Sequence, residues 1–194
     1  MKKTFLLIVA CVFAFATVQA QSSEVEATTQ LTKAEQFKAK NSFIKEETLY
    51  HRNLGLTVYA QLFTDLKSGE QLITFMFYGI TGPLGYLDFE EVDNLLLALE
   101  TILNESNNSS KKDNYSISYT APGGIDVYFT TEGLVGLSSK YGLRFSKKWY
   151  IIDDYGMRTS KYSQEVAILP ITALPNVIAA IKEAKAIANQ ALAK

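Results

Sequence analysis

The chain has little of the chemistry that metal sites need. It contains one cysteine, Cys11, and one histidine, His51, among 194 residues. Zinc sites use several cysteine or histidine ligands, so this composition excludes zinc fingers and two-histidine metalloprotease helices. The sequence therefore predicts no metal site and no cofactor. Because His51 stands alone between Tyr50 and Arg52, we interpret it as a structural residue rather than as a general base.

The chain also lacks an excess of positive charge and a long hydrophobic run. Nineteen Lys and Arg residues face 20 Asp and Glu residues, which gives a net charge of −1. Such a balance provides no field to hold nucleic acid, so we expect no nucleic-acid partner. The longest apolar run, residues 5–18, is shorter than the roughly 20 residues that a transmembrane helix needs. The mature chain is thus predicted to have no transmembrane segment.

Recognisable catalytic motifs are missing as well. There is no GxSxG nucleophile elbow, and the SxxK pattern at residues 42–45 has no SDN or KTG partner motif. Gly79, Gly82 and Gly85 have the spacing of neither GxGxxG nor GxxxxGK. Acidic residues open the next predicted helix and would repel a phosphate there. These absences favour a non-catalytic protein.

What the chain does contain, at its beginning, is the pattern of a secretory signal peptide. Lys2 and Lys3 precede the apolar run, and small residues stand before Gln21. We therefore predict cleavage after Ala20 and export to the bacterial periplasm or the medium. A lipoprotein anchored through Cys11 is the alternative, although the apolar run before Cys11 would be short for this purpose. Cleavage after Ala20 would leave a mature chain without cysteine.

The remaining chain divides into a polar segment and one domain. Residues 21–41 have few large apolar groups and are predicted to form a flexible tether, with Thr32 and Glu35 able to cap a short helical turn. Residues 42–194 are predicted to form a single domain with alternating and helical apolar patterns. Period-two alternation predicts strands near residues 56–63, 72–78, 115–120, 125–130, 141–152 and 162–168.

Two segments have the periodicity of amphipathic helices. One begins at Asp88, which is placed to cap it, and the other begins at Thr172. The order of elements, two strands, a helix, four strands and a helix, is typical of an α+β domain. We predict one antiparallel sheet of about six to seven strands with both helices packed on one face. The strand at residues 72–78 is apolar on both sides and is expected to lie at the centre of that sheet.

A binding surface is predicted on the sheet face opposite the helices. If Val58, Ile125 and Val127 face the helices, the residues between them face away, and these are Tyr59, Gln61, Asp126 and Tyr128. Tyrosine beside short polar groups on a rigid sheet is suited to a glycan or a protein partner. The other interpretation is that tyrosine simply favours strands.

Two further possibilities concern a small ligand and a hydrolase. The doubly apolar strand at residues 72–78 could line a pocket for a small apolar molecule. The carboxylates Asp153 and Asp154, or the acidic start of the first helix, could serve a hydrolase acting on an extracellular polymer. We expect an exported, non-catalytic module that binds a glycan, a protein or a small apolar ligand, with the hydrolase as the alternative.

Overall fold

The computed structural model describes residues 31–108, 115–131, 142–152 and 158–193. The predicted signal peptide and the two carboxylates Asp153 and Asp154 lie outside these residues. The described chain is an α+β fold with antiparallel sheets, as predicted. Within the described residues, no helix has the length and hydrophobicity required to cross a membrane.

The strands form two four-stranded antiparallel sheets, each with its strands in sequence order. The first sheet contains β1 (Ile44–Asn53), β2 (Thr57–Asp65), β3 (Gln71–Tyr78) and β4 (Pro83–Asp88). The second contains β5 (Ser116–Thr120), β6 (Ile125–Thr130), β7 (Gly142–Ile152) and β8 (Arg158–Pro170). The prediction of one sheet of six to seven strands is therefore wrong, because alternation identifies strands but not their partners.

Alternation in the sequence does not predict two strands of the first sheet, β1 and β4. Most of β1 is exposed and polar because it is an outer strand, so it has little apolar alternation. The short strand β4 contains Pro83 and Gly85, two residues that usually interrupt strands. Gly85 has a positive φ of 132°, and the β3–β4 register shifts beside it. The sequence pattern therefore does not predict this strand.

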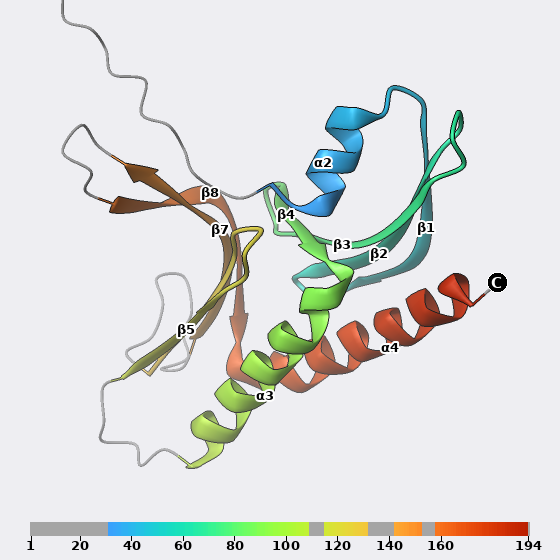
Figure 1. The fold of residues 1–194 in the computed structure, drawn as a ribbon. Coiled ribbons are helices and arrows are strands. Elements are labelled where there is room, and N and C mark those ends of the chain that lie inside the picture. Colours follow the sequence, from blue (N-terminus) through green and yellow to red (C-terminus); the bar gives the residue numbers. More distant parts are fainter. Residues whose placement is uncertain (1–30, 109–114, 132–141, 153–157, 194) are drawn as a thin grey trace, which may run out of the picture.

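Each sheet is followed by a short 3₁₀ turn and a long helix, so the two halves share one order of elements (Figure 1). The first half ends with η2 (Phe89–Glu91) and α3 (Val92–Asn108), and the second with η3 (Ile171–Ala173) and α4 (Leu174–Leu192). The helices pack against each other, while α4 contacts β1 and β2 and α3 contacts β5. Each helix therefore reaches the sheet of the other half.

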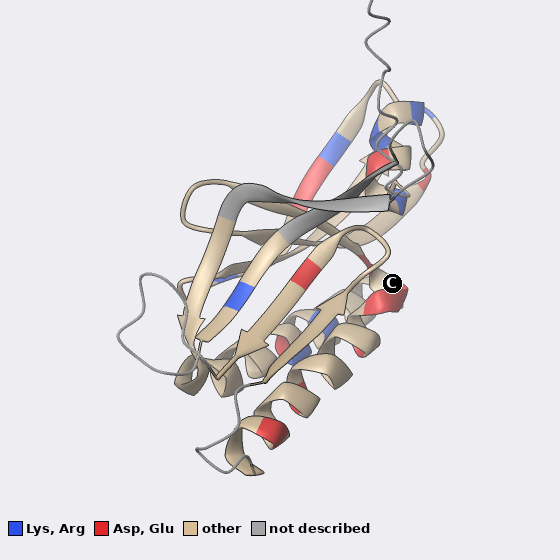
Figure 2. Cartoon of the chain, turned by 90° about the vertical axis from the view of Figure 1, so that its left-hand side faces the viewer, with Lys and Arg blue, Asp and Glu red and all other residues tan. Residues whose placement is uncertain are grey.

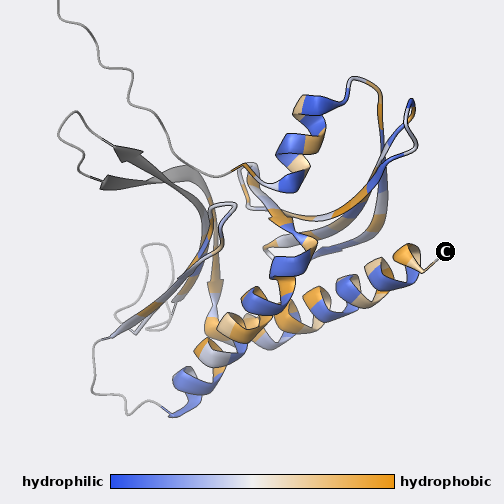
Figure 3. Cartoon of the chain, viewed as in Figure 1, coloured by the Kyte–Doolittle hydropathy of each residue, from blue (hydrophilic) through white to orange (hydrophobic). Residues whose placement is uncertain are grey.

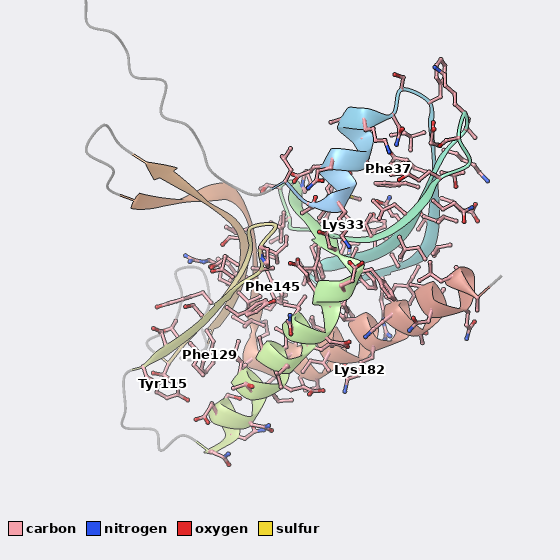
Figure 4. All side chains as sticks on the ribbon, viewed as in Figure 1. Lys33, Phe37, Tyr115, Phe129, Phe145 and Lys182 are labelled. Carbon is pink, nitrogen blue, oxygen red and sulfur yellow. The ribbon has the colours of Figure 1, made fainter. Side chains whose placement is uncertain are left out.

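The hydrophobic core lies where the two sheets and the two long helices meet. Figure 3 shows hydrophobic residues alternating along the strands and in bands along the helices. Phe75 and Phe77 of the first sheet belong to the same buried cluster as Phe129 and Phe145 of the second. Figure 4 labels Phe129 and Phe145 between the second sheet and the helices. One continuous core thus joins the two halves into a single body.

A third helix, α2 (Lys33–Lys40), covers the opposite face of the first sheet. Thr32 and Glu35 form the capping box that their spacing indicated. Phe37 is buried against Phe63 of β2 and points toward the sheet in Figure 4. The segment assigned to the tether therefore includes a packed, two-turn helix.

Asp88 caps a different helix from the one expected. Its side chain makes no capping hydrogen bond to η2. Instead, Asp88 Oδ1 accepts a hydrogen bond of 2.8 Å from the backbone amide of Lys33, at the start of α2. A carboxylate at this position offsets the positive end of the helix dipole and so helps to hold α2 on the domain.

Candidate functional site

The sequence-predicted binding residues do not form one surface. Tyr59 and Gln61 belong to β2 in the first sheet, whereas Asp126 and Tyr128 belong to β6 in the second. On both strands the alternate residues, such as Val58 and Val127, are buried in the core. All four predicted residues therefore face away from the core as expected, but from two different sheets.

Tyr59 is the best-placed aromatic residue of that prediction. Its ring is half-buried and lies 4.7 Å from the ring of His51 and 5.5 Å from the ring of Tyr78, measured between centroids. His51 itself is exposed on β1. The neighbouring Gln61 is only 7% exposed, and its Oε1 has no hydrogen-bond partner among the described residues.

The two predicted residues of the second sheet are occupied with internal contacts. Asp126 is 1% exposed and accepts a hydrogen bond of 2.6 Å from the Thr120 hydroxyl. The half-buried ring of Tyr128 lies 5.0 Å from the guanidinium carbon of Arg144. In Figure 2, which faces this sheet, the described strands carry few charged residues. The described residues of this face therefore offer few charged side chains for binding a charged ligand.

A groove lies between α3 and β5. It has a volume of about 480 Å³, within the range of small-ligand sites. Five of its ten lining residues are apolar and five carry polar side-chain groups. They are Asn94, Leu97, Ala98, Thr101, Ile102, Ile117, Ser118, Tyr119, Thr120 and Pro122.

The helical wall of this groove presents a large apolar side chain to solvent. Leu95 and Leu96 are buried in the core, but the next residue, Leu97, is 64% exposed. Consecutive residues on a helix are rotated by about 100°, so three leucines in a row cannot all reach one core. Asn94 and Thr101 lie beside Leu97 at spacings of three and four residues, and Ala98 has the same spacings from these two residues, so together they continue the wall along the helix.

The strand wall of the groove has a free backbone edge. β5 is the outermost strand of its sheet and pairs only with β6 in the described chain. The amide of Ala121 donates to the carbonyl of Ile125, and the amide of Thr131 donates to the carbonyl of Tyr115. Hydrogen-bonded pairs alternate along an antiparallel ladder. The N–H and C=O groups of Ile117 and Tyr119 therefore point toward β6, and those of Ser116, Ser118 and Thr120 point toward the free edge.

One end of the groove is held together by Tyr115. Its hydroxyl donates a hydrogen bond of 3.1 Å to the carbonyl of Glu105 in α3. Its ring also packs edge-on against Phe129, with 6.0 Å between centroids, and Figure 4 places the two residues side by side. Tyr115 thus ties the beginning of the β5 segment to the last turns of α3.

The other end of the groove is acidic. Pro122 borders both the groove and a smaller cavity of about 180 Å³, which Asp88 and Glu91 also line. One oxygen of Glu91 accepts a hydrogen bond from the Asp88 amide, while its Oε2 is buried without a partner in the described residues. Lys33 also lines this cavity, and its ammonium group forms an ion pair of 2.6 Å with Glu90.

Burial and like charge change the ionisation at this end. Loss of solvent raises the pKa of the Glu91 carboxyl, and the neighbouring negative charges of Asp88 and Glu90 raise it further. Burial also raises the pKa of Asp88 and of the Tyr119 hydroxyl, the latter with a contribution from the charge of Glu91. In the described part of the chain, these carboxylates repel one another, and the positive charge of Lys33 partly offsets them.

The sequence does not predict this groove, although one feature of the sequence indicates an exposed leucine on its helical wall. The run Leu95–Leu97 indicates that one leucine must leave the core, but nothing in the sequence shows which strand lies beside it. The apolar strand at residues 72–78, proposed as a pocket wall, is instead β3, whose Ile73, Phe75 and Phe77 fill the core. No group of three potential metal ligands is found among the residues that the structure describes.

Comparison with known protein families and with curated proteins finds no match to this chain.

Proposed function

We propose that this chain is an exported, non-catalytic binding module and that the groove between α3 and β5 is its ligand site. The observation that carries the proposal is the combination of an exposed apolar wall at Leu97 with a strand edge across the groove that has no partner among the described strands. Export itself rests on the signal-peptide pattern of residues 1–20.

The chemistry of the lining supports a ligand with an apolar body. Leu97, Ile102 and Ile117 provide apolar surface, and the Asn94 amide and the Thr101 hydroxyl provide polar contacts near it. Ligand sites combine mainly apolar walls with a few polar groups that fix orientation. An exposed leucine beside such a hollow gains free energy when a ligand removes it from water, about 25 cal/mol for each Å² of apolar surface.

The test is the binding of a neutral apolar dye, Nile red, to the purified protein and to a variant with a filled groove. Ala98 lines the groove and is half-buried, so Ala98→Trp places a bulky ring in it. Ala186→Trp, at an exposed position on α4, is the matched control because it adds the same ring away from the groove. We expect the dye to bind to the wild type and to the control with equal affinity.

In the Ala98→Trp variant we expect at least about tenfold weaker dye binding, which corresponds to a loss of about 1.4 kcal/mol. Circular dichroism and thermal unfolding of both variants verify that each is folded. Equal dye affinity in the folded Ala98→Trp variant and in the control would contradict the assignment of the groove.

A hydrolase is the second candidate function because the cavity beside the groove contains two carboxyl groups with raised pKa values, Asp88 and Glu91. A carboxyl group of raised pKa can act as a general acid. Its test is the release of reducing ends from a panel of labelled polysaccharides, with Glu91→Gln as the inactive variant. Turnover by the wild type that is lost in Glu91→Gln would replace the binding proposal.

A further inference from the structure

The free edge of β5 suggests what kind of ligand the groove accepts. The backbone N–H and C=O groups of Ser116, Ser118 and Thr120 point away from β6, as the alternation of the β5–β6 ladder requires. Ser118 and Thr120 also line the groove. An outer strand offers a row of donors and acceptors that another extended backbone can pair with.

We propose that the groove binds an extended segment of a partner protein, which adds to the edge of β5 as a fifth strand, points alternate apolar side chains toward α3, and places a basic side chain beside Glu91. This inference rests on the proposed function, because it assigns the class of ligand to the same groove. Peptide addition to a sheet edge draws affinity from main-chain hydrogen bonds and specificity from alternate side chains.

The requirement for alternate apolar side chains follows from the two faces of β5. Ile117 and Tyr119 pack against the core on the face that α3 covers, whereas the Thr120 side chain bonds to Asp126 on the opposite face. An added strand continues the same pleat. Every second side chain of the segment therefore faces Ile117, Tyr119 and the exposed Leu97, and the others face solvent.

The requirement for a basic residue follows from the charges at the Pro122 end. Among the described residues, the cation that acts on Asp88, Glu90 and Glu91 is Lys33, whose ammonium group is paired with Glu90. The cavity of about 180 Å³, which Lys33 lines together with Asp88, Glu91 and Pro122, has room for one long side chain. A lysine or arginine there compensates the charge of Glu91 by a charge-assisted contact.

The same charges argue against an acidic ligand and set the polarity of the segment. If the added strand is antiparallel to β5, its amino-terminal part lies near Thr120 and Glu91, so the basic residue comes first in the segment. If it is parallel, the basic residue comes last. Two peptides of identical composition and reversed sequence distinguish these arrangements.

The experiment measures peptide binding by isothermal titration calorimetry. The probe is a capped seven-residue peptide of alternating valine and threonine that begins with lysine, together with its reversed sequence. A third peptide has glutamate in place of lysine. Two more carry N-methyl groups on one or the other alternate set of backbone amides, which removes the hydrogen bonds of that set alone.

Two protein variants with matched controls identify the contacts. Ser118→Pro removes an amide that points to the free edge and leaves the β5–β6 hydrogen bonds intact, and Ser118→Ala keeps that amide. We expect at least about tenfold weaker binding to Ser118→Pro and less than about twofold change for Ser118→Ala. In the wild type the glutamate peptide should bind about tenfold more weakly than the lysine peptide, and Glu91→Gln should remove most of this difference.

We further expect that one N-methylated peptide binds and the other does not, since only one set of amides faces β5. Equal binding by both methylated peptides, or unchanged affinity in folded Ser118→Pro, would overturn strand addition. If no peptide binds but Ala98→Trp still weakens the binding of Nile red, this inference is overturned and the proposed function stands. The inference would also be overturned if the free protein forms a dimer and Ser118→Pro abolishes that dimer, because a second copy of the chain would then occupy the edge of β5.

Discussion

The Tyr115 hydroxyl lies 3.1 Å from the carbonyl oxygen of Glu105, to which it donates a hydrogen bond. This contact joins the strand wall of the groove to its helical wall. The two residues are ten positions apart, and between them lie residues 109–114, which the structure does not describe. Tyr115 therefore sets the separation of α3 and β5 at one end of the groove.

We predict that Tyr115→Phe removes this hydrogen bond while keeping the ring packed against Phe129. The free energy of unfolding should fall by about 0.5–1 kcal/mol, because the bond is exposed and the lost contribution is at the low end for hydrogen bonds. Urea denaturation measures this change. Nile red should bind more weakly, since the walls of the groove are no longer fixed. Unchanged affinity for the dye would separate Tyr115 from the geometry of the groove.

The exposed Leu97 should matter for ligand binding and not for folding. Leu97→Ser removes apolar surface that is 64% exposed, so we expect a change in unfolding free energy of less than about 0.5 kcal/mol. Dye affinity should fall severalfold. Leu66→Ser is the matched control because Leu66 is 65% exposed in a turn away from the groove. Equal effects of the two substitutions on dye affinity would contradict a special role of Leu97.

The ionisation of Glu91 predicts a pH-dependent stability difference. Because its folded pKa is raised, Glu91 binds a proton more readily in the folded than in the unfolded state. The contribution of Glu91 to the free energy of unfolding is therefore least favourable at a pH above its folded pKa. The contribution becomes more favourable as the pH falls from the folded pKa to the ordinary pKa of glutamate.

Glu91→Gln should accordingly stabilise the free protein at pH 7, by up to about 1 kcal/mol for a half-buried carboxylate with one oxygen lacking a partner. The gain should shrink as the pH is lowered below the ordinary range of glutamate. Thermal unfolding of both proteins between pH 3 and pH 8, roughly the span that contains these titrations, measures the difference. A destabilised Glu91→Gln variant at pH 7 would show that the carboxylate already has a favourable role inside the protein.

The junction between the two sheets depends on a close backbone contact. A Cβ atom at Gly79 would lie 2.4 Å from the carbonyl oxygen of Val166 in β8, and the amide of Ile80 donates a 3.3 Å hydrogen bond to that same oxygen. We predict that Gly79→Ala forces the segment away from β8 and costs about 1–3 kcal/mol of stability. Gly69→Ala is the comparison, because its positive φ of 75° adds backbone strain but no neighbouring atom blocks a Cβ. A Gly79→Ala variant as stable as the wild type would show that the segment moves freely from β8.

The structure agrees with the sequence-based predictions where a single periodicity determines which face of an element is buried. The apolar stripe of α4, from Leu174 to Ala188, is buried in the core as its spacing indicated. Alternation likewise predicts that Val58 and Val127 lie in the core and that their neighbours lie on the opposite face of each strand. These patterns can be read from the sequence because the spacing of residues along a helix or strand determines which side chains share a face.

Sequence patterns do not predict features that depend on which segments become neighbours. Asp88 had the position of a helix cap, but its carboxylate receives the amide of Lys33, which is 55 positions away. Residues Pro83–Asp88 form a strand only because β3 provides a partner. The groove has the same origin, because α3 and β5 become its walls through tertiary packing.

The most direct test of the groove as a strand-accepting site is amide hydrogen exchange at β5, followed by NMR in the free protein and with the lysine peptide. In the free protein, the amides of Ile117 and Tyr119 should be protected and those of Ser118 and Thr120 should exchange rapidly, because only the first two point toward β6. With the peptide bound, we predict that Ser118 and Thr120 become protected as well. Rapid exchange of both amides in a saturated complex would contradict the account.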